Sequence, residues 1–156
     1  MSYCNAQMMR LNMATVKQVA EYILHSFAQK EENDLTNLKL QKLMYYIQGF
    51  NLALNNERLI DAGVEAWQHG PVFPEAYHLY KSSGDSVIPF SKPSNHSAFT
   101  TDQIELMDEV IDIYGKYSGW TLRNMTHQES PWLKNESTGG AISDDDLLEF
   151  FKTRLN

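Results

Sequence analysis

The chain has 156 residues, of which 42% are apolar and 12% aromatic, and this length and composition predict one domain with one core. Its net charge of −7, from 13 basic and 20 acidic residues, disfavours binding to nucleic acids, which usually requires a basic patch. The single cysteine, Cys4, cannot form an internal disulfide, and no window approaches the roughly 18 consecutive apolar residues of a membrane span. We therefore expect a soluble, cytoplasmic protein that binds neither nucleic acid nor membrane.

The N-terminal third is expected to begin with an arm at residues 1–12, which show no clear period, followed by the single domain at residues 13–156. The first helix is predicted to begin at Thr15, because Thr15 and Gln18 match a capping box. A charged linker, residues 30–34, follows this helix and is expected to be solvated.

The stretch from residue 34 to residue 55 is predicted to be a buried helix at the centre of the fold. Its apolar side chains are spread around the full helical turn, and such a helix must be covered by its neighbours. Asp34 or Thr36 can supply the N-cap oxygen. The only formal charges between residues 36 and 54 are Lys39 and Lys42.

A small β-hairpin is expected after the central helix, formed by residues 58–60 and 64–68. Gly70 and Pro71 indicate a turn, because glycine reaches positive φ and proline fixes its own φ. Pro74 suits the first position of another helix, and residues 82–99 are expected to form a long, mobile loop.

Thr100 and Gln103 match a second capping box, and the helix that follows them is expected to run to Gly119. A short helix is expected at residues 120–126, in a segment that Pro131 ends.

The last helix is expected after a hinge at Gly139 and Gly140, with Ser143 as its N-cap and Asp146 three residues later. Together these elements predict a mainly α protein, a compact helical domain around a buried central helix, with a small β-hairpin element.

The polar residues match no common catalytic or metal-binding pattern. No histidine pair has the i, i+4 spacing of a helical zinc motif, and the chain contains no G-x-S-x-G elbow, P-loop or G-x-G-x-x-G motif. We therefore expect no metal, no cofactor and no enzymatic activity. An enzyme that uses His69 and His127 remains as a distant alternative.

Lys39 and Lys42 share one helix face with Tyr46 and Gly49, so this face must reach the surface or meet carboxylates. It could be a solvated seam or the rim of a partner-binding surface, in which Tyr46 supplies contact area and Gly49 permits close approach. Trp67, Tyr77 and Trp132 pose a similar choice between core residues and interface anchors. The candidate partner-binding residues are Lys39, Lys42, Tyr46, Gly49 and Tyr77.

Three blocks of sequence stand out together: LTNLKLQKLMYYIQGFNLAL at 35–54, EAWQHGPVFPEAYHLYK at 65–81 and LRNMTHQESPW at 122–132. In this order and spacing they resemble the SocA-like antitoxin family, whose domain is also called Panacea. The resemblance implies a mainly helical fold with a small β element and no enzymatic activity. The family's motif residues, most of which it implies to be fold determinants, match Gln41, Tyr45, Trp67, His69, Gly70, Pro71, Pro74, His127, Pro131 and Trp132.

The same resemblance implies a function. It indicates an antitoxin that binds a cognate protein toxin directly, in a toxin-antitoxin system that is often carried on a prophage, with the toxin expected to be encoded next door. The alternative is a proteolytic adaptor, with an ATP-dependent protease or a chaperone as a further partner, or a generic phage-encoded interaction protein without a toxin.

Overall fold

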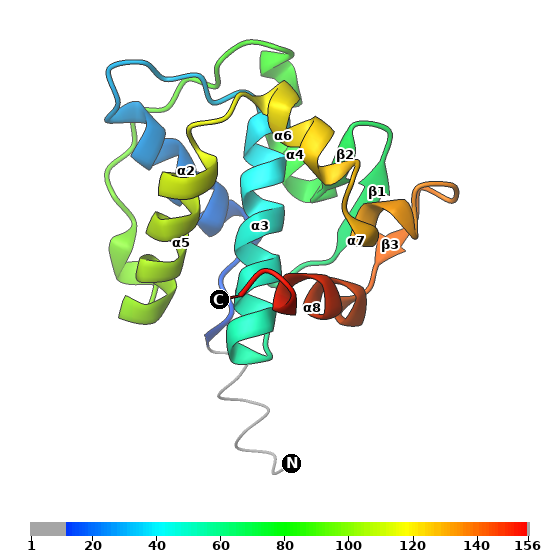
Figure 1. Ribbon diagram of the computed structural model, residues 1–156. Helices are drawn as coiled ribbons and strands as arrows, with labels where there is room; N and C mark the ends of the chain where they lie inside the picture. The colour runs from blue at the N-terminus through cyan, green and yellow to red at the C-terminus, as the bar shows by residue number, and fades with distance from the viewer. Residues whose placement is uncertain (1–11, 156) are drawn as a thin grey trace.

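The computed structural model of the protein describes residues 12–155, so the expected N-terminal arm lies, apart from Asn12, outside the described residues. The described residues contain seven α-helices, one of which lies at the centre of the fold among the others, and a small sheet lies to one side (Figure 1). This arrangement confirms the mainly α fold with a small β element. In chain order the elements are α2 (Val16–Ala28), α3 (Asn37–Asn55), β1 (Val64–Trp67), β2 (Gly70–Val72), α4 (Pro74–Tyr80), the 3-10 turns η1 (Lys81–Ser83) and η2 (His96–Ala98), α5 (Thr101–Tyr114), α6 (Gly119–Thr126), α7 (Ser130–Leu133), β3 (Ala141–Ile142) and α8 (Asp144–Lys152).

The central helix α3 is the predicted buried helix. The Thr36 side chain accepts a hydrogen bond from the Lys39 N–H as its N-cap, and Asn56 ends the helix in the left-handed conformation. Most of its side chains are buried, including Leu40, Leu43 and others on every side of the helix. The other elements are therefore positioned by their contacts with α3.

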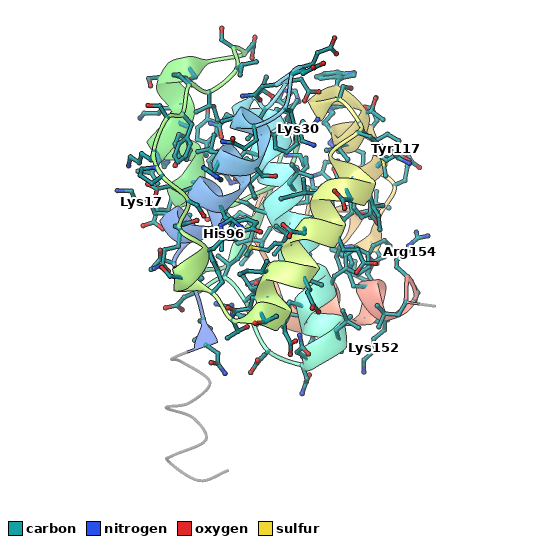
Figure 2. The ribbon with its side chains drawn as sticks, turned by 90° about the vertical axis from the view of Figure 1, so that its left-hand side faces the viewer. Lys17, Lys30, His96, Tyr117, Lys152 and Arg154 are labelled. Atoms are coloured by element: carbon teal, nitrogen blue, oxygen red, sulfur yellow. The ribbon has the colours of Figure 1, made fainter. Side chains whose placement is uncertain are left out.

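Helices α2 and α5 lie side by side on one flank of α3 (Figures 1 and 2). Both begin with the predicted capping box, at Thr15 in α2 and at Thr100 in α5. The Tyr22 hydroxyl of α2 donates a hydrogen bond to the Asp108 carboxylate of α5. Helix α5 ends at Tyr114, earlier than the predicted Gly119.

The sheet has the order β2-β1-β3 with antiparallel pairs, so the expected hairpin is only half correct. β1 forms, but it pairs with β2, which contains Gly70 and Pro71, and the turn lies at residues 68 and 69. Residues 58–60 do not join the sheet, because the buried Gln48 side chain accepts from the N–H groups of Leu59 and Ile60 and donates to the Ile60 carbonyl.

Prolines mark two helix starts. Pro74 lies in the first turn of α4, as predicted, whereas Pro131 lies in the first turn of α7 and does not end a segment. The missing N–H of proline costs nothing in a first turn, where no intrahelical acceptor exists.

The last helix, α8, has Ser143 as its N-cap, as predicted. Its Phe151 is fully buried against α3 at Gly49, where a Cβ atom would overlap the Phe151 ring. Helix α8 can thus pack closely on α3 because residue 49 has no side chain.

The long loop between α4 and α5 is anchored to the core. It contains η1 and η2, and the buried Ile88 donates its N–H to the Leu35 carbonyl at 3.0 Å.

Candidate functional site

The candidate site is a cavity of about 860 Å³ at the N-terminal end of α3, which we call the aromatic groove. It lies between the β1–β2 turn, α4 and the start of α6. These elements are labelled in the upper part of Figure 1. Its lining residues are Asp34, Thr36, Asn37, Leu38, Gln41, Lys42, Trp67, Gln68, His69, Val72, Tyr77, Lys81, Gly84, Asp85, Ser118, Gly119 and Trp120.

Large aromatic side chains line the groove, and two of them are exposed. Trp120 is 56% exposed and Tyr77 is 37% exposed. The Trp67 and Tyr77 rings meet edge to face with centroids 5.1 Å apart, and the His69 ring lies 5.9 Å from Trp120. Exposed tryptophan and tyrosine in a concave site are typical of the anchors of protein interfaces.

A relay of side-chain amides fixes α4 at the edge of the groove. Asn37 donates to the Tyr77 carbonyl at 3.1 Å, and the Gln41 amide donates to the Asn37 side chain at 2.9 Å. The Gln41 oxygen accepts from the Phe73 N–H at 2.9 Å, just before α4 begins. The N-cap residue and the middle of α4 are therefore tied to α3, and this holds Tyr77 in place.

Each strand of the β-hairpin accepts a hydrogen bond from one buried side chain, which comes from a helix. The Lys42 ammonium donates to the Pro71 carbonyl of β2 at 3.0 Å, and the Trp132 indole N–H donates to the Trp67 carbonyl of β1 at 2.8 Å. Burial, with a smaller effect of the nearby Arg123 charge, lowers the pKa of Lys42 to about 7. Gly70 has a φ of +106°, and a Cβ atom there would lie 2.6 Å from Lys42 Cε.

His127 supports the Trp132 side chain by stacking. Their ring centroids are 3.8 Å apart and the planes are 7° from parallel. Burial, followed by the charge of Arg123, lowers the pKa of the His127 imidazole, which favours the neutral ring in this stack.

Lys39 ties together the chain segments beneath the groove. Its ammonium contacts both oxygens of Asp34 at 2.8 and 2.9 Å, and it donates to the Gly115 carbonyl at 2.6 Å. It also lies 4.9 Å from the centroid of the Phe27 ring. This one side chain therefore links the start of α3 to the ends of α2 and α5.

The alternative in which the face of Lys39, Lys42, Tyr46 and Gly49 reaches the surface is wrong, because all four residues are buried. The Lys39 ammonium meets the carboxylate of Asp34, which was the other alternative for this face. The Lys42 ammonium instead donates to the Pro71 carbonyl. Tyr77 is the candidate partner-binding residue that lies at the surface. Its role in binding stays a prediction.

A buried carboxylate, Glu129, was missed by the sequence analysis. It accepts hydrogen bonds from the Tyr45 hydroxyl at 2.9 Å and the Tyr46 hydroxyl at 2.8 Å, and so joins the segment between α6 and α7 to α3. Burial raises the pKa of Glu129 to about 7, although these two hydrogen bonds and the charge of Arg154 act in the opposite direction. Figure 2 shows Arg154 just beyond the end of α8. The available signal was the acid inside the third sequence block, two residues before Pro131.

Trp120 was also missed as a site residue. It follows the helix start at Ser118 and Gly119 directly, so its side chain projects from the first turn of α6. A large apolar residue in the otherwise polar start of a helix was the signal that could have identified it.

Two classes of site find no support in the described part of the chain. Among residues 12–155 there is no group of three or more histidine, cysteine, aspartate or glutamate residues that could hold a metal ion. None of the helices described there is long and apolar enough to cross a membrane.

The sequence matches a known protein family over more than half of its length. Residues 40–133 match the family described as antitoxin SocA-like, Panacea domain. Over 54 residues the chain is 37% identical to Antitoxin SocA of Caulobacter vibrioides (strain NA1000 / CB15N), an alignment that covers 35% of this chain and 29% of that protein. The matched segment thus spans less than a third of this curated relative. No solved structure matches the chain significantly.

Proposed function

This chain belongs to the family of SocA-like antitoxins with a Panacea domain, and we propose that it neutralises a cognate protein toxin by binding it directly at the aromatic groove. The observation that carries this proposal is the exposed aromatic surface of Trp120 and Tyr77 in a concave site. Most of the groove lies within the matched residues 40–133.

The groove suits binding because its walls are held from within. The buried side chains of Gln41, Lys42 and Trp132 fix α4 and the hairpin through hydrogen bonds. A site that is already formed before binding loses little conformational entropy when a partner docks. The buried motif residues thus support the groove, and we propose that the exposed rings contact the partner.

The test begins with the reading frame next to this gene, whose product is expected to be the toxin. The frame is expressed alone and together with this protein in a bacterial host, and growth and co-purification are measured. Expression of the frame alone should arrest growth, and co-expression should restore growth and yield a complex. Restored growth without a complex would contradict direct binding.

Groove variants locate the interface. We expect the double variant Tyr77→Ala, Trp120→Ala to keep its melting temperature, because both side chains are exposed, but to lose the complex and the rescue of growth. Leu133→Ala is the matched control, since Leu133 is 49% exposed on α7 and does not line the groove. Equal rescue by the double variant and this control would move the interface elsewhere.

A further inference from the structure

Arg123 lies on the exposed indole ring of the aromatic groove. It follows Trp120 by three residues on α6, a spacing that places the two side chains on the same face of the helix. The guanidinium carbon is 4.6 Å from the centroid of the Trp120 ring, within the range of a cation–π contact. The His69 ring lies 5.9 Å from the same indole. The 56% exposed Trp120 ring therefore has one neighbour on its own helix and one on the β1–β2 turn.

The other surroundings of Arg123 do not favour a charge at this position. The side chain is partly buried, and it forms no ion pair with any carboxylate of residues 12–155. Its Nη1 donates to the Asn124 side chain at 3.0 Å, but its Nε is buried and meets no acceptor among these residues. A partly buried cation without a carboxylate and a buried donor without an acceptor both lower the stability of a fold.

Two other basic side chains lie near this guanidinium. Burial, and then the Arg123 charge, lowers the pKa of both Lys42 and His127. Arg123 thus disfavours the charged forms of two residues that hold the hairpin and the Trp132 ring in place. An arginine whose role was to stabilise the fold would be expected beside acids.

From these contacts we propose that Arg123 is a positioning residue, which holds the Trp120 indole in the orientation that contacts the partner protein in the aromatic groove. An exposed side chain loses rotational freedom when a partner binds, and a ring that is already held in one orientation loses less. The cation–π contact supplies this restraint from within the same helix. This inference rests on the proposed function, because it assigns Arg123 a role at the proposed binding surface.

The mobility of the Trp120 ring tests the proposal on the protein alone. The order parameters of the three tryptophan indole N–H groups are measured by ¹⁵N NMR relaxation. We expect Arg123→Met, which keeps a long unbranched side chain without the charge, to lower the order parameter of Trp120 and to leave those of Trp67 and Trp132 unchanged. Arg123→Lys should have a smaller effect, because an ammonium keeps the cation–π attraction but lacks the planar stacking surface.

Arg154→Met is the matched control for these measurements. The Arg154 guanidinium carbon lies 4.8 Å from the centroid of the Phe150 ring, so this variant removes a similar contact outside the lining of the groove. It should not change the order parameter of Trp120. An unchanged Trp120 order parameter in Arg123→Met, or an equal decrease in Arg154→Met, would overturn the inference.

Thermal stability separates positioning from support of the fold. We expect Arg123→Met to keep or raise the melting temperature, because the variant removes the unpartnered Nε and the charge beside Lys42. A structural role predicts the opposite sign. A clear decrease in melting temperature together with an unchanged Trp120 order parameter would show that Arg123 supports the fold and does not position the ring.

Affinity for the product of the neighbouring reading frame completes the test. Arg123→Met should weaken that complex about threefold to tenfold. In the Trp120→Ala background the same change should have no further effect, because no ring remains to be positioned. An equal further weakening in that background would show that Arg123 contacts the partner itself and would overturn the positioning role.

The two proposals fail in different ways. If Arg123→Met frees the Trp120 ring but the neighbouring gene product is neither bound nor neutralised by the wild type, the restraint on the ring stands and the antitoxin mechanism fails. If the wild type neutralises that product and Arg123→Met changes neither the ring mobility nor the affinity, the antitoxin function stands and the positioning role fails.

Discussion

Lys42 shows how a charged residue can belong to the interior of this fold. Its side chain is fully buried, its ammonium donates to the Pro71 carbonyl, and its Cε would be 2.6 Å from a Cβ atom at Gly70. The long apolar stem packs like a core residue while the terminal group holds a strand. A charge reversal here acts on folding before it can act on a partner.

We expect Lys42→Glu to lower the free energy of unfolding by on the order of 3–5 kcal/mol, because it leaves a buried carboxylate against a carbonyl oxygen. Lys42→Met should cost about 1–3 kcal/mol, since it keeps the volume but leaves the Pro71 carbonyl without its donor. Urea denaturation measures both. Lys81→Glu, at an exposed lysine of the groove, is the control and should change stability by less than about 0.5 kcal/mol. A Lys42→Glu variant as stable as this control would contradict the buried role.

Glu129 predicts a specific pH dependence of stability. Its pKa is about 7 in the folded protein, against an ordinary value of 4.5, so the folded state holds the proton more tightly than the unfolded state. The stability that this group contributes is fully present below pH 4.5 and is lost as the pH rises through about 7. The groups that affect it are the hydroxyls of Tyr45 and Tyr46 and the charge of Arg154.

The test compares the melting temperatures of the wild type and Glu129→Gln from about pH 5 to about pH 8. We expect the wild type to lose stability relative to the variant as the pH rises, because the glutamine cannot ionise. The difference isolates Glu129 from Lys42, whose lowered pKa has the opposite sign and makes its contribution fall as the pH drops towards 7. A constant difference across this range would show that Glu129 keeps its ordinary titration.

At the scale of elements, the packing of α8 on α3 depends on Gly49. Gly49→Ala should cost about 1–3 kcal/mol or more, because the new methyl group overlaps the Phe151 ring. Adding Phe151→Leu should restore part of this loss, so that the double variant is more stable than the sum of the single changes predicts. Gly63→Ala is the matched control, since a Cβ atom there meets nothing within 4 Å. Chemical denaturation of the wild type, the two single variants and the double variant completes the cycle, and strict additivity would exclude direct coupling.

The helices could be predicted because their signals are local. The capping boxes at Thr15 and Thr100 and the cap at Ser143 lie within a few residues of the groups that they bind. The strand partners could not be predicted in this way. The choice of β2 over residues 58–60 depends on Lys42 and Gln48, two side chains of α3 that reach across the fold to backbone groups.

The aromatic groove was even harder to predict from the sequence. Tyr77 was identified as a candidate, but Trp120 lies more than 40 residues away along the chain and comes next to the hairpin turn only after α6 has packed on α3. The burial of Lys39 and Lys42 could not be predicted, because charge predicts exposure and only the fold brings Asp34 and Pro71 to where they accept hydrogen bonds from the two lysines.

At the scale of the whole molecule, the buried polar contacts that hold the elements together come from α3 and do not involve the exposed rings of the groove. Lys39, Gln41, Lys42, Tyr45 and Tyr46 all project from α3 and bind other segments from within. The exposed side chains of Tyr77 and Trp120 make none of these hydrogen bonds, so we expect substitutions of these two residues to leave the packing around α3 intact. This division is consistent with one fold that could serve different partners through surface changes.

The distribution of charge over the molecule also predicts no binding to nucleic acid. Of the 13 basic residues, Lys39 and Lys42 are buried, and Arg58, Lys92 and Lys134 lie beside carboxylates, so these five do not contribute to a free basic patch. Because affinity for duplex DNA comes mainly from contacts of lysine and arginine with phosphates, we expect no measurable binding at physiological salt. Fluorescence anisotropy with a labelled duplex tests this, with a basic DNA-binding protein as the positive control. Micromolar binding that weakens as salt is added would reveal a phosphate-binding surface that the described fold does not provide.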